Sequence, residues 1–275
     1  ALYRKTVKAG DRLEFHRWTV LAAGRIEESP FKKLMAAAAR DESVARHVRE
    51  NLLTLQPDYV VFVPKQRREI VGDRYNDHFH VFDKPDGTLF AAWTQATKEG
   101  DVDQHVCFSR SRDKGGTCTE PIILAGSASH VNPHPIASWQ QPMVSKSGRI
   151  YMLWNQCVSN DPLHHGIMVG KYSDDDGDTW SQPRAVTLPR VDRDPLGKPP
   201  SWCIWQRPLR LGKDGKHIAG LTRHGVVTGE SATAAAVESE QENKDGRLQS
   251  KLAGSTVEFI QYDNIDDDPK IEDIR

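Results

Sequence analysis

Histidine, carboxyl and arginine side chains are concentrated in the middle of the chain, where nine of the eleven histidines lie between residues 78 and 224. Arginine offers parallel N–H donors to a carboxylate, and histidine or a pair of carboxyl groups transfers protons near neutral pH. Together these side chains suit a polar, often acidic, sugar. The candidate substrate-binding residues are Arg207, Arg223, Gln95, Gln141 and Gln156, and the candidate catalytic residues are Glu99, Asp101, His78 and His80.

Three similar segments position these residues, and each predicts a strand, a glycine turn and a second strand. The segments are His78–Gln95, Trp139–Gln156 and Trp205–Arg223, and the turn glycine precedes the last residue by eight positions in all three. The two ends of a hairpin lie together, and the shared spacing predicts the same register in each segment. The side chains expected on one face of the molecule are therefore His78, His80, Gln141, Arg207, Gln95, Gln156 and Arg223.

Each candidate also has a purely structural interpretation. His78 and His80 alternate on one strand and are equally suited to buried, hydrogen-bonded positions in the core. Arg207 and Arg223 are equally suited to ion pairs that hold the fold together. The loop 96–104, which carries the two candidate carboxylates, is typical of a solvated connection.

Two turns follow the first two segments and start 62 residues apart. They are Ser111–Cys118 and Ser173–Trp180, and both contain the pattern Ser-x-Asp-x-Gly-x-Thr. The Asp accepts backbone N–H groups across a β-turn, the Gly tolerates a positive φ, and a following Trp fills the space between sheets. A calcium loop of the EF-hand type would need Glu at its twelfth position, which is Pro183 here. The turns are therefore predicted to be structural, and four strands per repeat predict a propeller blade.

These turns resemble the Asp-box of the sialidase-like (BNR/Asp-box) β-propeller superfamily, over roughly residues 58–224. The resemblance implies an all-β propeller of four-stranded blades, six-bladed if complete, preceded here by an N-terminal helical segment. It also implies glycoside hydrolysis with a tyrosine nucleophile, an arginine triad for the substrate carboxylate, and an acid/base carboxyl group.

The chain departs from the family in the segment that opens the first blade, because no Arg-Ile-Pro is present and the nearest arginine is Arg74. Arg223 resembles a later arginine of the triad. Glu99 or Asp101 falls where the acid/base loop of the family lies. Tyr262 is the candidate for the tyrosine nucleophile.

Two domains are expected, residues 1–57 and residues 58–275. The first contains a predicted helix over residues 29–53, which begins at Ser29-Pro30 and continues into an alanine-rich run. The second is the propeller, with a polar, alanine-rich insertion around residues 225–254.

The composition excludes several classes of function. The net charge of −1 lacks the basic excess of a nucleic-acid surface, and no apolar run approaches the ~20 residues of a membrane span. The four cysteines form no Cys-x-x-Cys pair, so no zinc site is expected. We predict no metal and no cofactor. The localisation is undecided, although a glycan substrate favours a secreted or periplasmic protein.

Three functions fit these observations. The leading hypothesis is a sialidase-like exo-glycosidase that cleaves a terminal, acidic sugar. The second is a propeller polysaccharide lyase that uses His and Tyr on uronic acids, for which residues 76–80 (Asn-Asp-His-Phe-His) are well suited. The third is a non-catalytic glycan-binding propeller.

Overall fold

The computed structural model describes residues 60–65, 72–129, 135–158, 165–191, 199–211, 215–224 and 255–275, together with residues 46, 194 and 197. The chain divides into Ala1–Asp58 and Tyr59–Arg275, and all the strands described lie in the second unit. The predicted helix over residues 29–53 lies outside the described residues except for Arg46, which is helical. The insertion at 225–254 also lies outside them, and the predicted division into two domains stays a prediction. No helix within the described ranges is long and apolar enough to cross a membrane.

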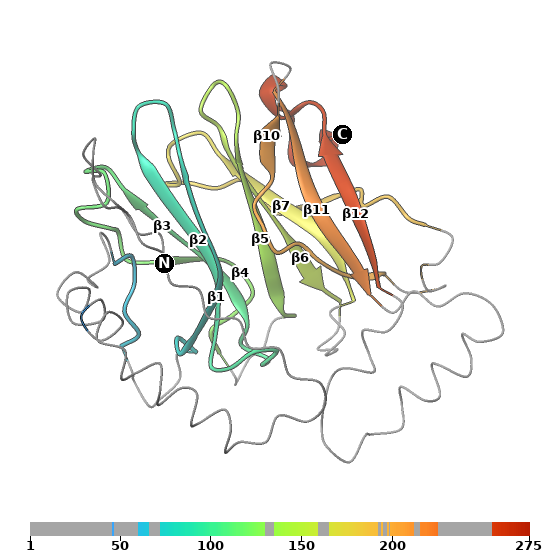
Figure 1. Cartoon of the computed structure of the whole chain (residues 1–275), viewed down its shortest axis with the longest axis horizontal. Coiled ribbons are helices and arrows are strands. Elements are labelled where there is room, and N and C mark those ends of the chain that lie inside the picture. The colour runs from blue at the N-terminus through green and yellow to red at the C-terminus, as the bar shows by residue number, and fades with distance from the viewer. Residues whose placement is uncertain are drawn as a thin grey trace, which may run out of the picture. The chain divides into compact units, whose positions relative to one another are not determined.

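Two four-stranded antiparallel sheets repeat the same meander (Figure 1). The first consists of β1 (Tyr75–Asp83), β2 (Leu89–Ala96), β3 (His105–Ser111) and β4 (Ile122–Ala125). The second consists of β5 (Ala137–Val144), β6 (Ile150–Cys157), β7 (Gly166–Ser173) and β8 (Arg184–Val186). The first two predicted hairpins are therefore confirmed.

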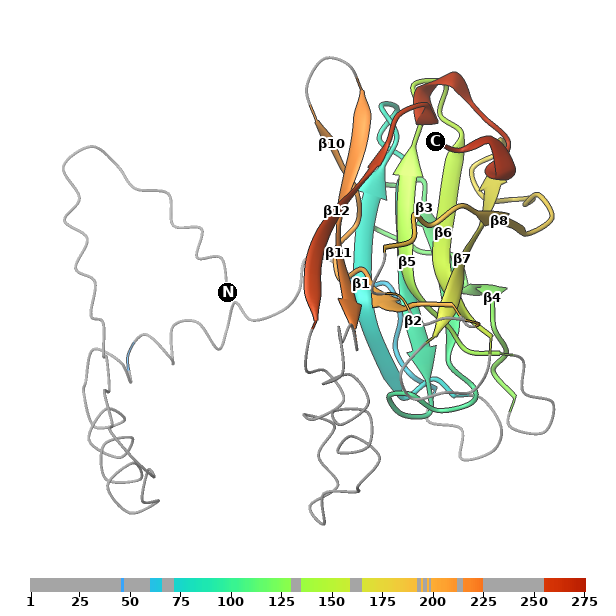
Figure 2. The same ribbon diagram turned by 90° about the vertical axis from the view of Figure 1, so that its right-hand side faces the viewer.

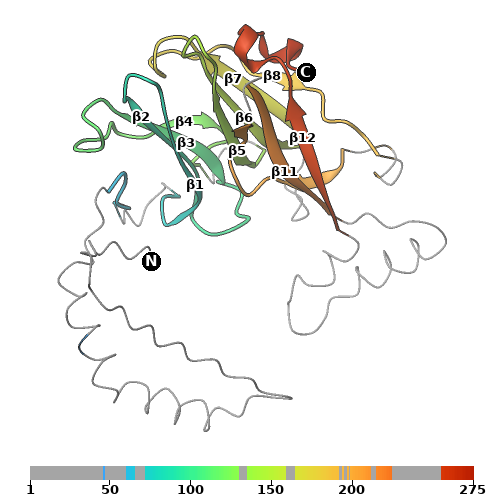
Figure 3. The same ribbon diagram turned by 45° about the horizontal axis from the view of Figure 1, so that its top comes forward.

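In the third sheet the first strand is broken into two short pieces, and both pair with the same neighbour. Its strands are β9 (Ser201–Cys203), β10 (Leu209–Leu211), β11 (Lys216–His224) and β12 (Thr256–Tyr262). Two short 3₁₀ turns, η2 (Ile265–Asp267) and η3 (Ile271–Asp273), follow. The three sheets are blades of a sialidase-like propeller and follow one another in chain order (Figure 3).

The core lies between the faces of neighbouring blades, because successive side chains of a strand point to opposite faces. On β6, Met152 and Trp154 pack in a cluster with residues of the first blade such as Phe108. Tyr151 and Leu153 of the same strand pack in a second cluster with residues of the third blade. The middle blade is therefore covered on both faces, which explains the nearly continuous burial of β6 (Figure 2).

The end of each blade that carries the hairpin turn between its first and second strands is called the turn end here, and it lies at the top of Figure 1. The two Asp-boxes form the β-turns that the sequence predicts. The Asp175 carboxylate accepts the N–H of Thr179 at 2.8 Å and its hydroxyl at 2.6 Å, and the N–H of Gly177 donates to the Ser173 hydroxyl at 2.8 Å. Asp113 makes the equivalent bonds in the first blade. These bonds hold the pKa of both carboxyl groups down, at about 2.

Trp180, at the end of the second Asp-box, packs on the preceding blade. Its ring meets Phe108 edge-on with centroids 5.1 Å apart, and its Nε1–H donates to the carbonyl of Gly177. The side chain is half-buried, which is less than the sequence predicts. Gly177 is required here, because it has a φ of 85° and an added Cβ would lie 2.3 Å from the Phe108 ring.

The opposite end of the blades, called the mouth end here, differs in having irregular first strands. Register shifts occur between Asp77 and His80 in β1 and between Ser138 and Gln141 in β5. The bulged residues His78 and Trp139 have φ values of 53° and 54°, a conformation that bulky side chains rarely adopt. A β-bulge changes the direction of the side chains beside it. The strand pattern of the sequence did not predict these bulges.

The outer face of the third blade is not covered by any described residue. Val257 and Phe259 on β12 are 88% and 87% exposed, whereas Val106 and Phe108 at the equivalent pairing positions of β3 are buried between blades. The side chains on this face of the first strand, including Arg207 and Leu209, are accordingly more exposed than their counterparts in the other two blades.

Candidate functional site

Three aromatic rings meet at the mouth end, one from each blade. They belong to His78, Trp139 and Trp205, which occupy the same position in the three repeats, and they are called the aromatic cluster here. The centroid of His78 lies 5.9 Å from that of Trp139 and 5.1 Å from that of Trp205, and the two indoles are 6.4 Å apart. His78 and Trp139 are buried, but Trp205 is 53% exposed. The cluster therefore presents one indole to solvent.

The hydrogen bonds of His78 define its tautomer. The Trp139 Nε1–H donates to Nε2 of His78 at 3.2 Å, so Nε2 is an acceptor. Nδ1 then carries the proton and donates to the Thr94 hydroxyl at 3.3 Å, and that hydroxyl donates to Gln140 at 2.9 Å. Burial lowers the pKa of His78, opposed by the charge of Asp77. His78 is therefore a neutral imidazole with both nitrogens engaged.

A tyrosine–carboxylate pair stands beside this imidazole. The Tyr75 hydroxyl donates to Asp77 at 2.9 Å, and Asp77 also accepts the backbone N–H of His78 at 2.7 Å. Burial raises the pKa of Tyr75, and the bond to Asp77 and the charge of Glu99 raise it further. Burial also acts to raise the pKa of Asp77, but its two hydrogen bonds outweigh that effect and the pKa is lowered.

Tyr75 was not among the residues predicted from the sequence, because the tyrosine nucleophile was expected near the end of the chain. The predicted nucleophile was Tyr262, which is 2% exposed and packed in the core between the second and third blades. Its hydroxyl donates to Gln141 at 2.5 Å, and burial raises its pKa. The prediction of Tyr262 as the nucleophile is therefore wrong, because the hydroxyl is inaccessible. The signal in the sequence was the proximity of Tyr75 to Asp77 and His78 on one strand.

His80 and Gln141, which share one repeat position, are both buried and both incompletely hydrogen-bonded. Nε2 of His80 and Nε2 of Gln141 have no hydrogen-bond partner among the described residues. Burial, together with the charges of His78 and Arg207, lowers the pKa of His80 to about 4. His80 is therefore a neutral imidazole whose Nε2 is buried and has no described hydrogen-bond partner, and it lies close enough to Arg207 for that charge to affect its pKa.

The two candidate arginines have different surroundings. Arg207 is half-buried and makes no hydrogen bond or ion pair with any described residue. Arg223 is 1% exposed, and each of its guanidinium nitrogens donates within the protein. Nη1 binds Asp194 at 3.0 Å, Nε binds Glu258 at 3.0 Å, and Nη2 binds Glu258 at 3.0 Å and the carbonyl of Pro189 at 2.9 Å. The expectation that Arg223 holds a ligand carboxylate is therefore corrected, since its donors are consumed by buried carboxylates.

Two of the candidate glutamines are also engaged within their own blades. Gln95 donates to Asn76 at 2.8 Å and accepts from His105, and Gln156 donates to the carbonyl of Pro135 at 2.9 Å. These bonds fix the mouth ends of β2 and β6. Neither amide is directed at the aromatic cluster by a described contact.

The two candidate carboxylates lie on the loop between β2 and β3. Glu99 is exposed, and its charge acts on Tyr75. Asp101 is half-buried and its carboxylate accepts the N–H of Val102 at 2.9 Å. Pairwise contacts and charge effects thus connect Glu99 with Tyr75, Tyr75 with His78 through Asp77, and His80 with His78 and Arg207, whereas Arg223 is bound by Asp194 and Glu258. Across the described ranges, no three His, Cys, Asp or Glu side chains are grouped closely enough to hold a metal ion.

Comparisons with known proteins agree with this architecture. The family model described as BNR repeat-like domain matches residues 87–245. Similar solved structures include the Hadza microbial sialidase Hz136, at 20% identity over 55% of this chain and 33% of that chain, with a TM-score of 0.42. The NanB sialidase of Streptococcus pneumoniae is 12% identical over 66% of this chain and 47% of that chain, with a TM-score of 0.43.

A polysaccharide lyase described as a PL25 ulvan lyase is 15% identical over 60% of this chain and 37% of that chain, with a TM-score of 0.36. The chain therefore spans between a third and a half of the length of these three structures. A search of curated proteins gave no match.

Proposed function

The chain belongs to the BNR repeat-like domain family, and we propose that the mouth end of its blades binds an acidic saccharide on which the protein acts. The observation that carries this proposal is Arg207, a half-buried guanidinium without a carboxylate partner among the described residues, two positions from the exposed indole of Trp205. A guanidinium in a partly desolvated position binds a carboxylate by two parallel hydrogen bonds. The indole offers an apolar face to the C–H groups of a sugar ring.

The first candidate reaction is hydrolysis of a terminal acidic sugar with a tyrosine nucleophile. The Tyr75 hydroxyl already donates to Asp77, so this carboxylate is placed to accept the proton as the phenolate oxygen attacks the anomeric carbon. Glu99, exposed and near Tyr75, is the candidate acid for the leaving oxygen. Water then releases the sugar from Tyr75, and Glu99, which has given up its proton, acts as the base.

A second candidate reaction, β-elimination from a uronate, is favoured by one specific observation. His80 is neutral, has an unpartnered Nε2 and lies near Arg207. Arg207 would neutralise the uronate carboxylate and thereby acidify the neighbouring C–H. His80 would remove that proton, a C=C bond would form as the glycosidic C–O bond breaks, and the leaving oxygen would take a proton from water. The product of this reaction is unsaturated and absorbs in the near ultraviolet, whereas hydrolysis gives a saturated sugar.

Binding tests the proposal directly. Isothermal titration with sialic acid and with glucuronate is expected to show binding that Arg207→Ala weakens about 10- to 100-fold, as for a lost charge-assisted hydrogen bond of about 1.5–3 kcal/mol. Arg112→Ala is the matched control, because Arg112 is an exposed arginine of the first Asp-box. Equal affinity of both variants and of the unchanged protein would show that Arg207 does not hold the acid group.

Product analysis then separates the two reactions. Incubation with sialosides and with uronic-acid polysaccharides is followed by chromatography and by near-ultraviolet absorbance. For hydrolysis we expect Tyr75→Phe to lower the rate by at least about 100-fold, and for elimination we expect His80→Gln to have that effect. Binding without either product would leave a glycan-binding domain as the function.

A further inference from the structure

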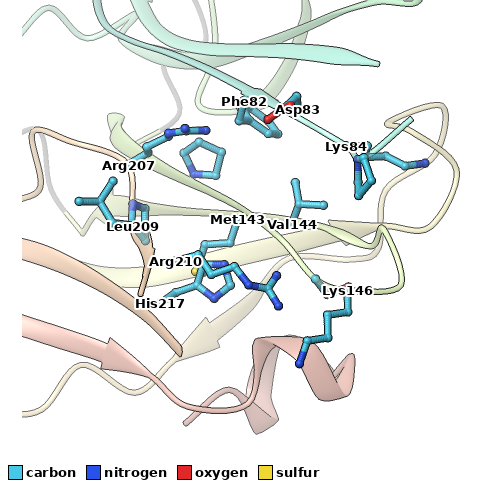
Figure 4. Close-up of a pocket in the computed structure, with 14 residues that line it drawn as sticks. Phe82, Asp83, Lys84, Met143, Val144, Lys146, Arg207, Leu209, Arg210 and His217 are labelled. Carbon is cyan, nitrogen blue, oxygen red and sulfur yellow. The ribbon is translucent and has the colours of Figure 1, made fainter. Parts of the chain in front are cut away.

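A cavity of about 570 Å³ lies between the turn-end halves of the first strands. Its walls come from the last residues of β1 and β5, from β10 and from His217 on β11 (Figure 4). The lining includes neither Tyr75 nor any residue of the aromatic cluster. The cavity is therefore a different place from the catalytic part of the mouth, and Arg207 at one end of the picture is shared between the two.

Positive charge dominates the lining of this cavity. Lys84, Lys146, Arg207 and Arg210 line it, and the one carboxylate in the lining is that of Asp83. The charge of Lys84 is already balanced, because its Nζ lies 2.5 Å from Asp176 of the second blade. The remaining three cations decide what the cavity attracts.

These three cations have too few carboxylates around them. Lys146 and Arg210 both pair with Asp266, so one carboxylate serves two cations. Arg207 pairs with no described residue. Within the lining itself four cations face one carboxylate, and the carboxylates that pair with Lys84, Lys146 and Arg210, which are Asp86, Asp176 and Asp266, lie outside it. A solvated anion is attracted to such an excess when the walls are partly dry.

His217 supplies a buried ring nitrogen without a described partner in the same lining. Its side chain is 3% exposed, and its Nδ1 has no hydrogen-bond partner among the described residues. A buried polar atom without a hydrogen-bond partner destabilises the fold. When the imidazole is protonated, this nitrogen carries a hydrogen, and an oxygen atom of a bound anion would accept a hydrogen bond from it.

The rest of the lining is apolar, which strengthens charge interactions within the cavity. Phe82, Pro142, Met143, Val144 and Leu209 form most of the remaining wall. Electrostatic attraction at a given distance is stronger in such surroundings than in bulk water. Polar groups at a few points of an apolar concave wall are typical of a site for a small ligand.

We propose that this cavity is an oxyanion site that takes a sulfate or carboxylate group, held by Arg210, Lys146 and the imidazole of His217. The oxyanion comes either from a saccharide that extends from the mouth or from a free inorganic ion. In the first case the site rests on the proposed function, because it would hold an acidic group of the same saccharide. In the second case it is independent of that function. The measurement therefore uses groups that the mouth chemistry does not involve.

The test is a titration of the protein followed by NMR of ring-labelled histidines. Sodium sulfate is compared with sodium chloride at equal ionic strength, and glucuronate and a sulfated monosaccharide form two further arms. Sulfate is expected to shift one histidine signal saturably, and His217→Gln identifies that signal by its loss. Burial and the charge of Arg210 lower the pKa of His217, and they outweigh the charge of Asp266 and a hydrogen bond to the Gly215 backbone, which raise it. A bound anion favours the charged imidazole, so the pH midpoint of the His217 titration should move upward.

Two variants make the outcome decisive. Arg210→Ala is expected to weaken sulfate binding at least about tenfold. Lys146→Ala should also weaken it, and the fold tolerates this change because the side chain is 63% exposed. Lys216→Ala is the control, because Lys216 pairs with Asp263 and does not line the cavity. Tyr75→Phe should leave sulfate binding unchanged even if it abolishes activity.

Saturable binding of sulfate, or of either acidic sugar, that depends on Arg210 and Lys146 supports the site and shows where its oxyanion comes from. Equal shifts with chloride and sulfate, or binding that both variants leave unchanged, overturn it. Arg207→Ala affects both sites, so the separation comes from Tyr75→Phe: loss of activity with normal sulfate binding would show that the two proposals stand apart.

Discussion

The two ends of the same strands are built by different means. At the turn end, two Asp-boxes repeat one set of hydrogen bonds, and the residues that make them follow one another within eight positions. At the mouth end, the repeat keeps the positions but changes the residues, so that one position holds His80, Gln141 and Arg207 in successive blades. A short motif can determine a turn. The surroundings of a changed residue, however, determine whether its side chain packs in the core or can contact a ligand.

The largest effect that would sharpen this comparison is expected at Arg223. Arg223→Met leaves Asp194 and Glu258 buried or half-buried without their cation, which should cost about 3–5 kcal/mol of unfolding free energy. Urea denaturation measures the loss, and Arg223→Lys, which keeps the charge without the fork, should recover part of it. A small loss in Arg223→Met would return this arginine to the candidates for ligand binding.

The second effect concerns His80 and depends on pH. The pKa of His80 is about 4 in the folded protein and close to 6.5 when unfolded, so between these values the unfolded chain binds more protons. Stability therefore falls as the pH is lowered from 6.5 to 4, by roughly 3 kcal/mol from this group. His80→Gln places the glutamine of the second blade here and should flatten that part of the curve. An unchanged pH dependence would mean that the fold does not lower the pKa of His80.

A smaller loss is expected at Trp180, which joins the turn ends of two blades. Trp180→Ala should cost roughly 2 kcal/mol, less than for a fully buried tryptophan, because the side chain is half-buried against Phe108. Cys118→Ala, at the matching position of the first Asp-box, should cost under about 1 kcal/mol. Thermal unfolding of the two variants side by side measures the difference, and equal losses would contradict a bridging role of Trp180.

The smallest effect is expected at Asp175. The pKa of its carboxyl group is lowered to about 2 by the hydroxyl and N–H of Thr179. A group whose pKa is depressed in the fold stabilises it above the unfolded value of about 3.8, and this contribution disappears as the pH falls toward 2. Asp175→Asn should lower the melting temperature slightly at pH 7, lose that difference near pH 2, and leave saccharide binding unchanged. Loss of binding would place the Asp-box in the site.

The sequence predicted those features that depend on neighbouring residues. The Asp-boxes and the glycine turns are local, and the first two hairpins have the same register, with Asp77 opposite Thr94 and Ser138 opposite Asn155. Four-stranded blades followed from these turns and from their spacing.

The details of the site could not be predicted in the same way, because they depend on distant partners. Asp194 and Glu258 lie 29 and 35 residues from Arg223, and no local pattern indicates that they would surround it. Gln141, 121 residues from Tyr262, accepts the hydrogen bond of that buried hydroxyl. Packing between blades determines these contacts, and a single repeat contains no information about it.

The bulges at His78 and Trp139 imply a trade-off between stability and function at the mouth. Both residues hold a left-handed backbone conformation that costs non-glycine residues roughly 1–2 kcal/mol. Glycine or asparagine would relieve this strain, but either would remove a ring from the contact that leads to Trp205. Selection for a more stable protein and selection for an intact aromatic surface therefore act in opposite directions at these two positions. Laboratory evolution for heat resistance alone would be expected to erode the mouth before it alters the Asp-boxes.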